Sequence, residues 1–266
     1  LDVKDLEKKI STKTKAIIPV HYAGNVGDIE DIYNIAKKYK LLVIEDAAHA
    51  FGSYYKMKKV GSFGDVSCFS FDGIKNITSG EGGCVVSNNL KVIEYIKDAR
   101  LLGVQGDTEK RIKLKRTWHP NVSFQGWRYH MSDLMAAIGR VQLLRVEKFR
   151  RKRKTLLKRY IKNLKNEKLI DLLSYDPEEV MPHIFCIIIP KNVDRENLIS
   201  KLLDKGIQTG IHYFPNHRLD FFRDKSKLIN TDKIYTRILS LPMHVDLNIK
   251  DIDFICKNLK KFTNNL

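Results

Sequence analysis

The pattern that most constrains the fold is a strand–helix–strand unit in residues 16–46. Residues 16–20 form a short apolar run, and apolar side chains then recur at helical spacing from residue 29 to residue 39. Asp28 stands where a helix N-cap is expected. A second apolar run, residues 41–44, ends in Glu45 and Asp46. Two strands joined by a crossover helix pair in parallel, so the sequence predicts an α/β domain.

The rest of the chain predicts two domains, residues 1–165 and 166–266. Strands are expected at residues 66–71 and 83–87, and a helix near residues 91–102. Ser132 is placed to cap a long helix, which we expect to continue through the basic block at residues 150–154. The last part predicts strands at 184–189 and 207–212, a helix capped by Asp194, and a final helix capped by Asn248, which together suggest a smaller α+β domain. Four apolar side chains of the long helix are expected to face the core: Leu134, Met135, Ile138 and Val141.

The charge balance favours anionic partners. The chain of 266 residues carries 48 Lys and Arg against 31 Asp and Glu, a formal net charge of +17. Such a charge suits nucleic acid or phosphorylated small molecules. The basic block at residues 150–154 has no interleaved aromatic side chains for base stacking, and Leu156, Leu157 and Tyr160 keep the helical period. We interpret the block as a solvated helix face and expect no nucleic-acid partner, although a basic binding module remains an alternative on the charge alone.

Composition excludes several other classes of protein. No run approaches the roughly 20 apolar residues of a membrane span, and no signal peptide is visible, so we expect no membrane partner. The four cysteines, at positions 68, 84, 186 and 256, form no C-x-x-C pair. We therefore expect reduced cysteines, a cytoplasmic protein and no metal site.

Three side chains between residues 46 and 75 have the chemistry of a pyridoxal phosphate site. Asp46 ends a buried strand, where ligands bind in open α/β sheets, although a lone Asp there is equally well explained as a turn cap. Ser70 and Lys75 follow another strand, before the small residues of 78–83. Phe71, Ile74 and Ile77 flank the lysine, and partial burial lowers the pKa of a lysine and makes its amine nucleophilic. A carboxylate for a pyridine nitrogen, a hydroxyl for a phosphate and an amine for an aldehyde are the groups this cofactor needs.

A series of motifs covers nearly the whole chain. They are VHYAG (20–24), EDAAHAFG (45–52), KVGSFGD (59–65), CFSF (68–71), KNITSGEGG (75–83), GWRYHMSD (126–133), AAIG (136–139), GIHYFPNH (210–217) and LSLPMH (239–244). In this order they resemble the DegT/StrS family of pyridoxal-phosphate-dependent aminotransferases, which act on nucleotide-linked keto sugars. The resemblance implies the aspartate-aminotransferase fold: a large domain with a mixed, mostly parallel sheet, a smaller α+β domain, and a homodimer with active sites at the interface.

The resemblance also implies roles for the cofactor residues. Lys75 matches the lysine that binds the cofactor aldehyde and then serves as general base. Asp46 matches the aspartate on the pyridine nitrogen, and Ser70 a serine that binds the phosphate. His49 stands where the family more often has Gln, near the phenolic oxygen. Arg128 replaces an Asn that in many members reaches the phosphate of the neighbouring subunit's cofactor.

For the substrate, the resemblance points to His212, Tyr213 and above all His217, in a segment that approaches the sugar. The basic loop at residues 110–116 is interpreted as a solvated loop, with contact to a nucleotide diphosphate as the alternative. The implied reaction moves an amino group from an amino acid, expected to be glutamate, through pyridoxamine phosphate to a keto sugar. Such aminated sugars serve surface polysaccharides or sugar-modified metabolites.

Alternative functions are a pyridoxamine-dependent sugar dehydratase, whose members carry His where this chain has Lys75, and a catalytically incomplete fragment. The second alternative arises because family members usually carry a long additional N-terminal segment. That segment includes a loop that cradles the cofactor phosphate, and we expect this chain to lack it.

Overall fold

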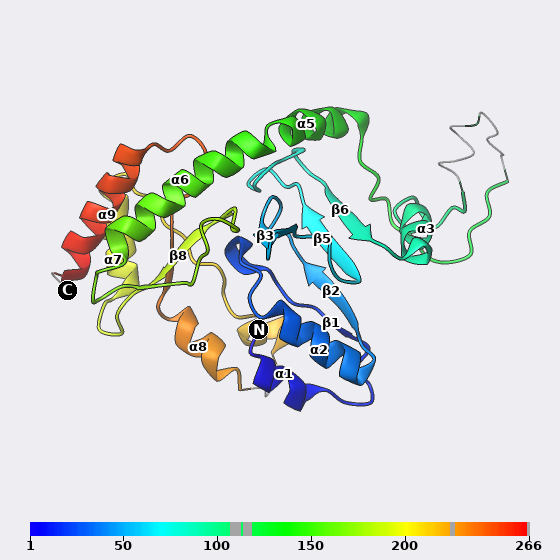
Figure 1. The fold of residues 1–266 in the computed structure, drawn as a ribbon, viewed down its shortest axis with the longest axis horizontal. Helices are drawn as coiled ribbons and strands as arrows, with labels where there is room; N and C mark the ends of the chain where they lie inside the picture. The colour runs from blue at the N-terminus through cyan, green and yellow to red at the C-terminus, as the bar shows by residue number, and fades with distance from the viewer. Residues whose placement is uncertain (107–112, 114–118, 224–226, 265–266) are drawn as a thin grey trace. The chain divides into compact units, whose positions relative to one another are not determined.

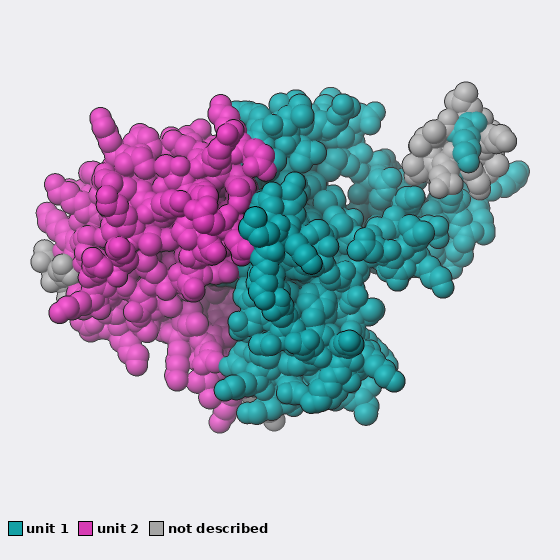
Figure 2. All heavy atoms as spheres, in the orientation of Figure 1, with its two compact units in different colours: residues 1–22, 26–146 teal, residues 23–25, 147–266 magenta. Residues whose placement is uncertain are grey.

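The computed structural model describes residues 1–106, 113, 119–223 and 227–264. The chain divides into two compact units (Figure 2): unit 1 contains residues 1–22 and 26–146, and unit 2 contains residues 23–25 and 147–266. The boundary between the two units therefore lies after residue 146, whereas the sequence suggested a domain boundary after residue 165. The helix that was expected to end the first domain belongs, from residue 147 onwards, to the second unit.

Unit 1 is built on a four-stranded sheet (Figure 1). Its strands are β1 (Ala16–Ile17), β2 (Leu42–Asp46), β5 (Val66–Ser70) and β6 (Gly83–Ser87), hydrogen-bonded in the order β1-β2-β5-β6. The pairs β1·β2 and β2·β5 are parallel, whereas β5·β6 is antiparallel. The prediction of a mixed, mostly parallel sheet is thus confirmed. A separate antiparallel pair, β3 (Tyr54–Tyr55) and β4 (Lys58–Lys59), lies between β2 and β5 in the sequence.

One face of this sheet is packed against helices. Among the described residues, the helices of unit 1 are α1 (Val3–Lys9), α2 (Ile29–Tyr39), α3 (Leu90–Ala99) and α5 (Asp133–Leu144), and a 3₁₀ turn spans Tyr22–Gly24. Helix α2 follows Asp28, and its apolar stripe is buried. The stripe of Ile29, Ile32, Ile35 and Ala36 packs with Val43 of β2 and with partly buried side chains of α1 in one core.

The structure corrects the expectation that the apolar side chains of the helix after Ser132 face the core. Helix α5 is capped as predicted, because the Ser132 hydroxyl accepts a hydrogen bond from the Met135 amide at 3.3 Å. The helix nevertheless has no buried residue, and Leu134, Ile138 and Val141 are exposed by 81%, 49% and 55%. Helical periodicity identified an apolar stripe correctly but could not show that this chain leaves the stripe uncovered.

Unit 2 combines a three-stranded antiparallel sheet with helices. The strands are β7 (Asp171–Leu172), β8 (Phe185–Ile188) and β9 (Ile238–Leu241), in the order β7-β8-β9. The helices are α6 (Val146–Leu164), α7 (Arg195–Leu203), α8 (Ile229–Tyr235) and α9 (Ile249–Asn264), with 3₁₀ turns at Asn216–Arg218 and Asp220–Phe222. In the core the Tyr160 and Phe185 rings stack at 4.3 Å, and α9 buries Ile252, Cys256 and Leu259.

Two further expectations for unit 2 were wrong. Residues 207–212 do not form a strand, and within the described residues they contribute only the bridge between Gly210 and Ser240. The basic block at 150–154 is not entirely solvated, because Arg153 is buried. Its Nη1 donates to the carbonyls of Pro182, His183 and Met243 at 2.8, 3.2 and 3.0 Å.

Membrane-spanning helices, metal-binding clusters and disulfide bonds are absent from the described residues. No helix among them combines the length and apolarity that crossing a bilayer requires. No group of three or more His, Cys, Asp and Glu side chains in this part of the chain is arranged to hold a metal ion. The four cysteines are free thiols.

Candidate active site

Asp46 and Ser70 lie on one face of the sheet, at one edge. In the parallel pair β2·β5, Asp46 is opposite Cys68. Side chains paired across strands share a face, and so do side chains two residues apart along a strand, so Asp46, Cys68 and Ser70 face the same way. Ser70 is two residues beyond Cys68, roughly 7 Å further along the strand. The sheet therefore presents a carboxylate and a hydroxyl on the same face, at the carboxyl ends of neighbouring strands.

Lys75 lies in the loop that connects β5 to β6. These strands pair antiparallel with Ser70 opposite Gly83, so the loop begins and ends beside Ser70. Backbone hydrogen bonds from Lys75 N to Asp72 O at 3.1 Å and from Ser79 N to Phe71 O at 2.9 Å fold the loop back on itself. The Lys75 side chain is half-buried, and among the described residues its amine has no hydrogen bond or ion pair. The amine is accordingly not held by another side chain of the described residues.

The residue next to Lys75 ties its loop to the loop that follows Asp46. Asn76 is buried, and its Nδ2 donates to the carbonyl oxygen of Phe51 at 3.0 Å. The Phe51 ring meets the Phe71 ring edge to face at 5.3 Å. The two loops are thus held by a polar contact and an aromatic contact. This brings the backbone of Lys75 close to the segment that begins with Asp46.

Glycines at the end of the loop allow close backbone approach. A Cβ on Gly83 would lie 2.5 Å from the carbonyl oxygen of Phe69. A Cβ on Gly82, whose φ is +150°, would meet the Ser79 Oγ at 2.6 Å. The close approach in both places requires a residue without a side chain. The small residues at 78–83 therefore allow the close path of the loop. Their contacts do not indicate which ligand the loop would meet.

On the other face of β2 lies a buried polar network that the sequence did not reveal. Glu45 accepts a hydrogen bond from the Tyr33 hydroxyl at 2.5 Å, and its other oxygen lies 2.6 Å from Nε2 of His21. Glu45 and His21 are fully buried. Burial and the Glu45 carboxylate raise the pKa of Tyr33 well above its usual value, so its hydroxyl remains a donor. The amide of His21 also donates to the Asp46 carbonyl at 2.9 Å, so this network fixes the end of β2.

His49 and Arg128 occupy different environments in unit 1. His49 is buried in the turn after β2, with its ring 6.1 Å from that of Tyr22. In the same turn, the Ala48 amide donates to Oδ1 of Asp46 at 3.1 Å. Arg128 is exposed, and its segment bridges antiparallel to Leu101. The structure therefore brings His49 into the Asp46 loop, whereas Arg128 points to a surface of the unit.

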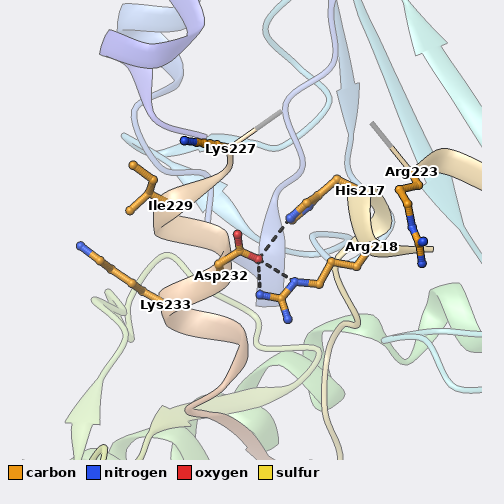
Figure 3. Close-up of a pocket in the computed structure, with 7 residues that line it drawn as sticks. All are labelled: His217, Arg218, Arg223, Lys227, Ile229, Asp232 and Lys233. Carbon is orange, nitrogen blue, oxygen red and sulfur yellow. Dashed lines mark hydrogen bonds and ion pairs between the residues drawn. The ribbon is translucent and has the colours of Figure 1, made fainter. Parts of the chain in front are cut away.

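The three proposed substrate residues belong to unit 2, and the contacts of His217 differ from those of His212 and Tyr213. His217 lines a hollow and turns toward Asp232 (Figure 3), with 3.1 Å between Nε2 and Oδ1. Its neighbour Arg218 binds the same carboxylate. His212 instead lies 2.8 Å from the Ser240 hydroxyl through Nδ1, and Tyr213 is exposed. Of the basic loop at 110–116, all but Lys113 lies outside the described residues.

A second hollow in unit 1, of about 720 Å³, lies along β5 and β6. Its lining includes Cys68, opposite Asp46, and Gly83, opposite Ser70. Burial and the nearby Asp46 carboxylate raise the pKa of the Cys68 thiol, which is therefore protonated at neutral pH. The remaining walls are largely apolar and come from α3 and residues 129–135.

The three polar side chains at and beyond the strand ends suit pyridoxal phosphate. Asp46 keeps one carboxylate oxygen beyond the Ala48 bond, and Ser70 offers a hydroxyl on the same face. Lys75 supplies the amine from the connecting loop. A half-buried carboxylate, a hydroxyl and a free amine at the carboxyl edge of a mostly parallel sheet fit this cofactor in type and order. The fold and the donor set define a pyridoxal-phosphate-dependent enzyme.

Comparison with known proteins identifies the family. The profile of the DegT/DnrJ/EryC1/StrS aminotransferase family matches residues 1–260, and the chain belongs to this family. A Campylobacter jejuni relative, named UDP-4-amino-4,6-dideoxy-N-acetyl-beta-L-altrosamine transaminase, is 36% identical over 264 residues, which cover 96% of this chain and 68% of the relative.

Solved structures agree with this assignment. The aminotransferase PseC of Helicobacter pylori, described as involved in the biosynthesis of pseudoaminic acid, superposes with a TM-score of 0.92 at 28% identity, over 100% of this chain and 71% of PseC. The Streptococcus pneumoniae protein Spr1654, described as a sugar aminotransferase and solved in its PMP form, gives a TM-score of 0.89 at 26% identity, over 100% of this chain and 73% of that protein. The chain is a pyridoxal-phosphate-dependent sugar aminotransferase.

Proposed function

We propose that the protein transfers an amino group from an amino acid, with glutamate as the donor, to the keto group of a nucleotide-linked deoxy sugar. The product would serve the synthesis of surface polysaccharides or sugar-modified metabolites, and the enzyme would work in the cytoplasm. The observation that carries the proposal is the placement of Lys75, in a loop tied by Asn76 to the segment that follows Asp46. The nucleotide-sugar substrate rests on the similarity to a transaminase whose own name is that of a UDP-linked amino sugar.

Each cofactor residue has a proposed task. The Asp46 carboxylate holds the proton on the pyridine nitrogen, and the Ser70 hydroxyl binds the phosphate. His49, buried in the turn after Asp46, would lie near the phenolic oxygen of the cofactor. When bound, the cofactor supplies an electron sink for the carbanion that forms next to the migrating nitrogen. The Lys75 amine would hold the cofactor through its aldehyde at rest, and its Nζ would then act as the base that moves the proton between the substrate α-carbon and the cofactor carbon C4′.

We further propose that the enzyme works as a homodimer. Helix α5 exposes Leu134, Ile138 and Val141, and the neighbouring Trp127 and Tyr129 are also exposed and stack at 6.2 Å. Contiguous exposed apolar side chains of this kind mark a surface that another protein covers. Arg128 lies between the two aromatic residues, so the same interface would carry its guanidinium to the cofactor phosphate of the second copy.

His217, Tyr213 and His212 are the proposed substrate contacts of unit 2. Of these, His217 has the strongest support, because it lines a hollow and is oriented by Asp232.

Borohydride reduction in the presence of pyridoxal phosphate, followed by peptide mapping, tests the proposal. Reduction makes the bond between a lysine and the cofactor irreversible, so a single labelled peptide containing Lys75 is expected. The Lys75→Ala variant should lose that label, whereas Lys58→Ala, which removes an exposed lysine of the same unit, should keep it. Label spread over many surface lysines would contradict the proposal.

A further inference from the structure

Two of the sequence motifs meet in unit 2, where Ser240 contacts His212. Ser240 belongs to LSLPMH (239–244) and His212 to GIHYFPNH (210–217). Nδ1 of His212 lies 2.8 Å from the Ser240 hydroxyl oxygen. Ser240, on β9, is 4% exposed, whereas His212 is half-buried. The imidazole is therefore held through Nδ1 by a side chain of the protein interior.

The Ser240 hydroxyl has a second polar neighbour, the thiol of Cys186. Cys186 lies directly opposite Ser240 in the antiparallel pair β8·β9, so the two side chains share one face of the sheet. Their Sγ and Oγ atoms are 3.1 Å apart, and Cys186 is fully buried. The thiol, the hydroxyl and the imidazole thus form a continuous chain of polar groups that runs from the sheet to His212.

The surroundings of His212 also fix the orientation of its ring. Gly210 exchanges two backbone hydrogen bonds with Ser240, at 2.8 and 3.0 Å, which hold the His212 segment beside β9. A Cβ on Gly210 would lie 2.9 Å from Cε1 of His212, so the ring packs closely over the glycine. The Tyr213 ring meets the His212 ring edge to face, with 4.9 Å between ring centres. With the ring held in this way, the remaining variable is the position of its proton.

The Ser240 hydroxyl has one proton, and its two neighbours differ as acceptors. An unprotonated imidazole nitrogen is a good acceptor, whereas a thiol sulfur is a weak one. The chain is best satisfied when the Cys186 thiol donates to Oγ of Ser240 and the Ser240 hydroxyl donates to Nδ1 of His212. The single proton of a neutral imidazole then lies on Nε2.

We propose that Ser240, supported by Cys186, is a positioning residue that fixes His212 as the neutral tautomer with its proton on Nε2. In this state the imidazole donates one hydrogen bond and carries no charge. It therefore suits an uncharged oxygen, such as a hydroxyl or keto oxygen of a sugar, better than a phosphate. The contact with a sugar rests on the proposed function, whereas the tautomer requires neither a ligand nor a reaction at Lys75.

Nuclear magnetic resonance of the full chain, labelled with ¹⁵N-histidine and supplied with pyridoxal phosphate, tests the tautomer at neutral pH. Correlations between the ring nitrogens and the protons on the ring carbons distinguish the two neutral tautomers from the charged ring. The signals that disappear in His212→Gln belong to His212. We expect the pattern of a ring protonated on Nε2 alone. A ring protonated on Nδ1 alone, or on both nitrogens, would overturn the proposal.

A matched pair of variants tests the role of Ser240 in setting the tautomer. In Ser240→Ala the donor to Nδ1 is lost, so the His212 nitrogen signals should move toward the average of the two neutral tautomers. The control Ser200→Ala deletes the same hydroxyl from an exposed position on α7 and should keep the wild-type pattern. An unchanged pattern in Ser240→Ala would show that this residue does not position His212.

A kinetic measurement tests the contact with a sugar separately. The probe is UDP-4-amino-4,6-dideoxy-N-acetyl-beta-L-altrosamine, the amino sugar in the name of the Campylobacter jejuni relative, which would donate its amine in the reverse of the proposed transfer. For Ser240→Ala, we expect half-saturation at an about tenfold higher sugar concentration and a nearly unchanged maximal rate, because one hydrogen bond to the sugar is weakened. Equal half-saturation in the two proteins would refute the sugar contact. A chain that shows the expected tautomer but does not react with this sugar would count against the proposed function alone.

Discussion

Glu45 and Asp46 are neighbours along β2, and their carboxylates face opposite sides of the sheet. Glu45 is fully buried and lies between Tyr33 and His21. Asp46 is half-buried and faces the side that also carries Ser70. The alternation of a strand gives the two adjacent carboxylates different tasks, one structural and one proposed for the cofactor.

Glu45 is predicted to be important for the stability of unit 1. The variant Glu45→Ala leaves His21 and the Tyr33 hydroxyl without the carboxylate that joins them, in a fully buried place. We expect a loss of about 2–4 kcal/mol in the free energy of unfolding, because two buried polar side chains lose their hydrogen-bond partner. Urea unfolding measures this loss. Glu81→Ala, an exposed position of the same unit, is the control and should stay within about 0.5 kcal/mol of the wild type. Similar midpoints for both variants would show that the network contributes nothing.

Arg153 is predicted to anchor unit 2. Its Nη1 donates to the carbonyls of Pro182, His183 and Met243, and burial lowers its pKa to about 10. The variant Arg153→Ala removes the common donor from three buried acceptors, so we expect a loss of about 2–4 kcal/mol in stability. Thermal and urea unfolding should detect it. Exposed Arg151 lies on the same helix, and its replacement by Ala should be nearly neutral. A neutral Arg153 variant would mean that water replaces the guanidinium.

Asp253 is predicted to make the stability of unit 2 depend on acid pH. Hydrogen bonds from Arg159, at 2.6 and 2.5 Å, and from Asn163 lower the pKa of this carboxyl from 3.8 to about 2. Because the pKa of Asp253 is lower in the folded state, the ionised carboxylate stabilises unit 2 fully above pH 4. This stabilisation is lost as the pH falls toward 2. Asp253→Asn should therefore lower the melting temperature at pH 6 and converge with the wild type near pH 2.

Two controls complete the pH experiment. Asp204→Asn, at an exposed position of the same unit, should follow the wild type at every pH. A constant difference between Asp253→Asn and the wild type from pH 6 to pH 2 would show that the effect is steric and does not arise from ionisation.

The apolar stripe of α5 is predicted to hold two copies together. Placing a charge in it, as in Ile138→Asp, should raise the dissociation constant of the dimer by about a hundredfold or more, since a central apolar contact is replaced by a desolvated charge. Analytical ultracentrifugation measures the change. Leu90→Asp introduces the same charge at a more exposed apolar residue on α3 and should leave association unchanged. A wild-type chain that is monomeric at all concentrations would refute the dimer.

Sequence reasoning succeeded where the signal is local. The apolar run at residues 41–44 predicted β2, and the strand expected at residues 66–71 became β5, with Asp46 and Ser70 at the ends of these two strands. It failed for β9 (Ile238–Leu241), a four-residue strand without clear turn signals on both sides. Residues 207–212 have the composition of a strand but make a single bridge, between Gly210 and Ser240 on the outer edge of β9.

The site residues that were missed depend on contacts far apart in the sequence. His21 and Glu45 are 24 positions apart, and no spacing rule indicates that one will meet the other. Arg153 looked solvated because its neighbours are cationic, and its acceptors are supplied by carbonyls 29 to 90 positions away. The exposed face of α5 was missed for the converse reason, since an apolar stripe does not reveal whether its own chain covers it.

The hairpin formed by β5, the Lys75 loop and β6 has a consequence for how the protein is made. Every strand of the unit 1 sheet, together with Asp46, Ser70 and Lys75, lies between residues 16 and 87. Only short loops must close to make these contacts, which keeps their entropic cost low. On a ribosome, the proposed cofactor pocket can therefore take shape before most of unit 2 has been synthesised.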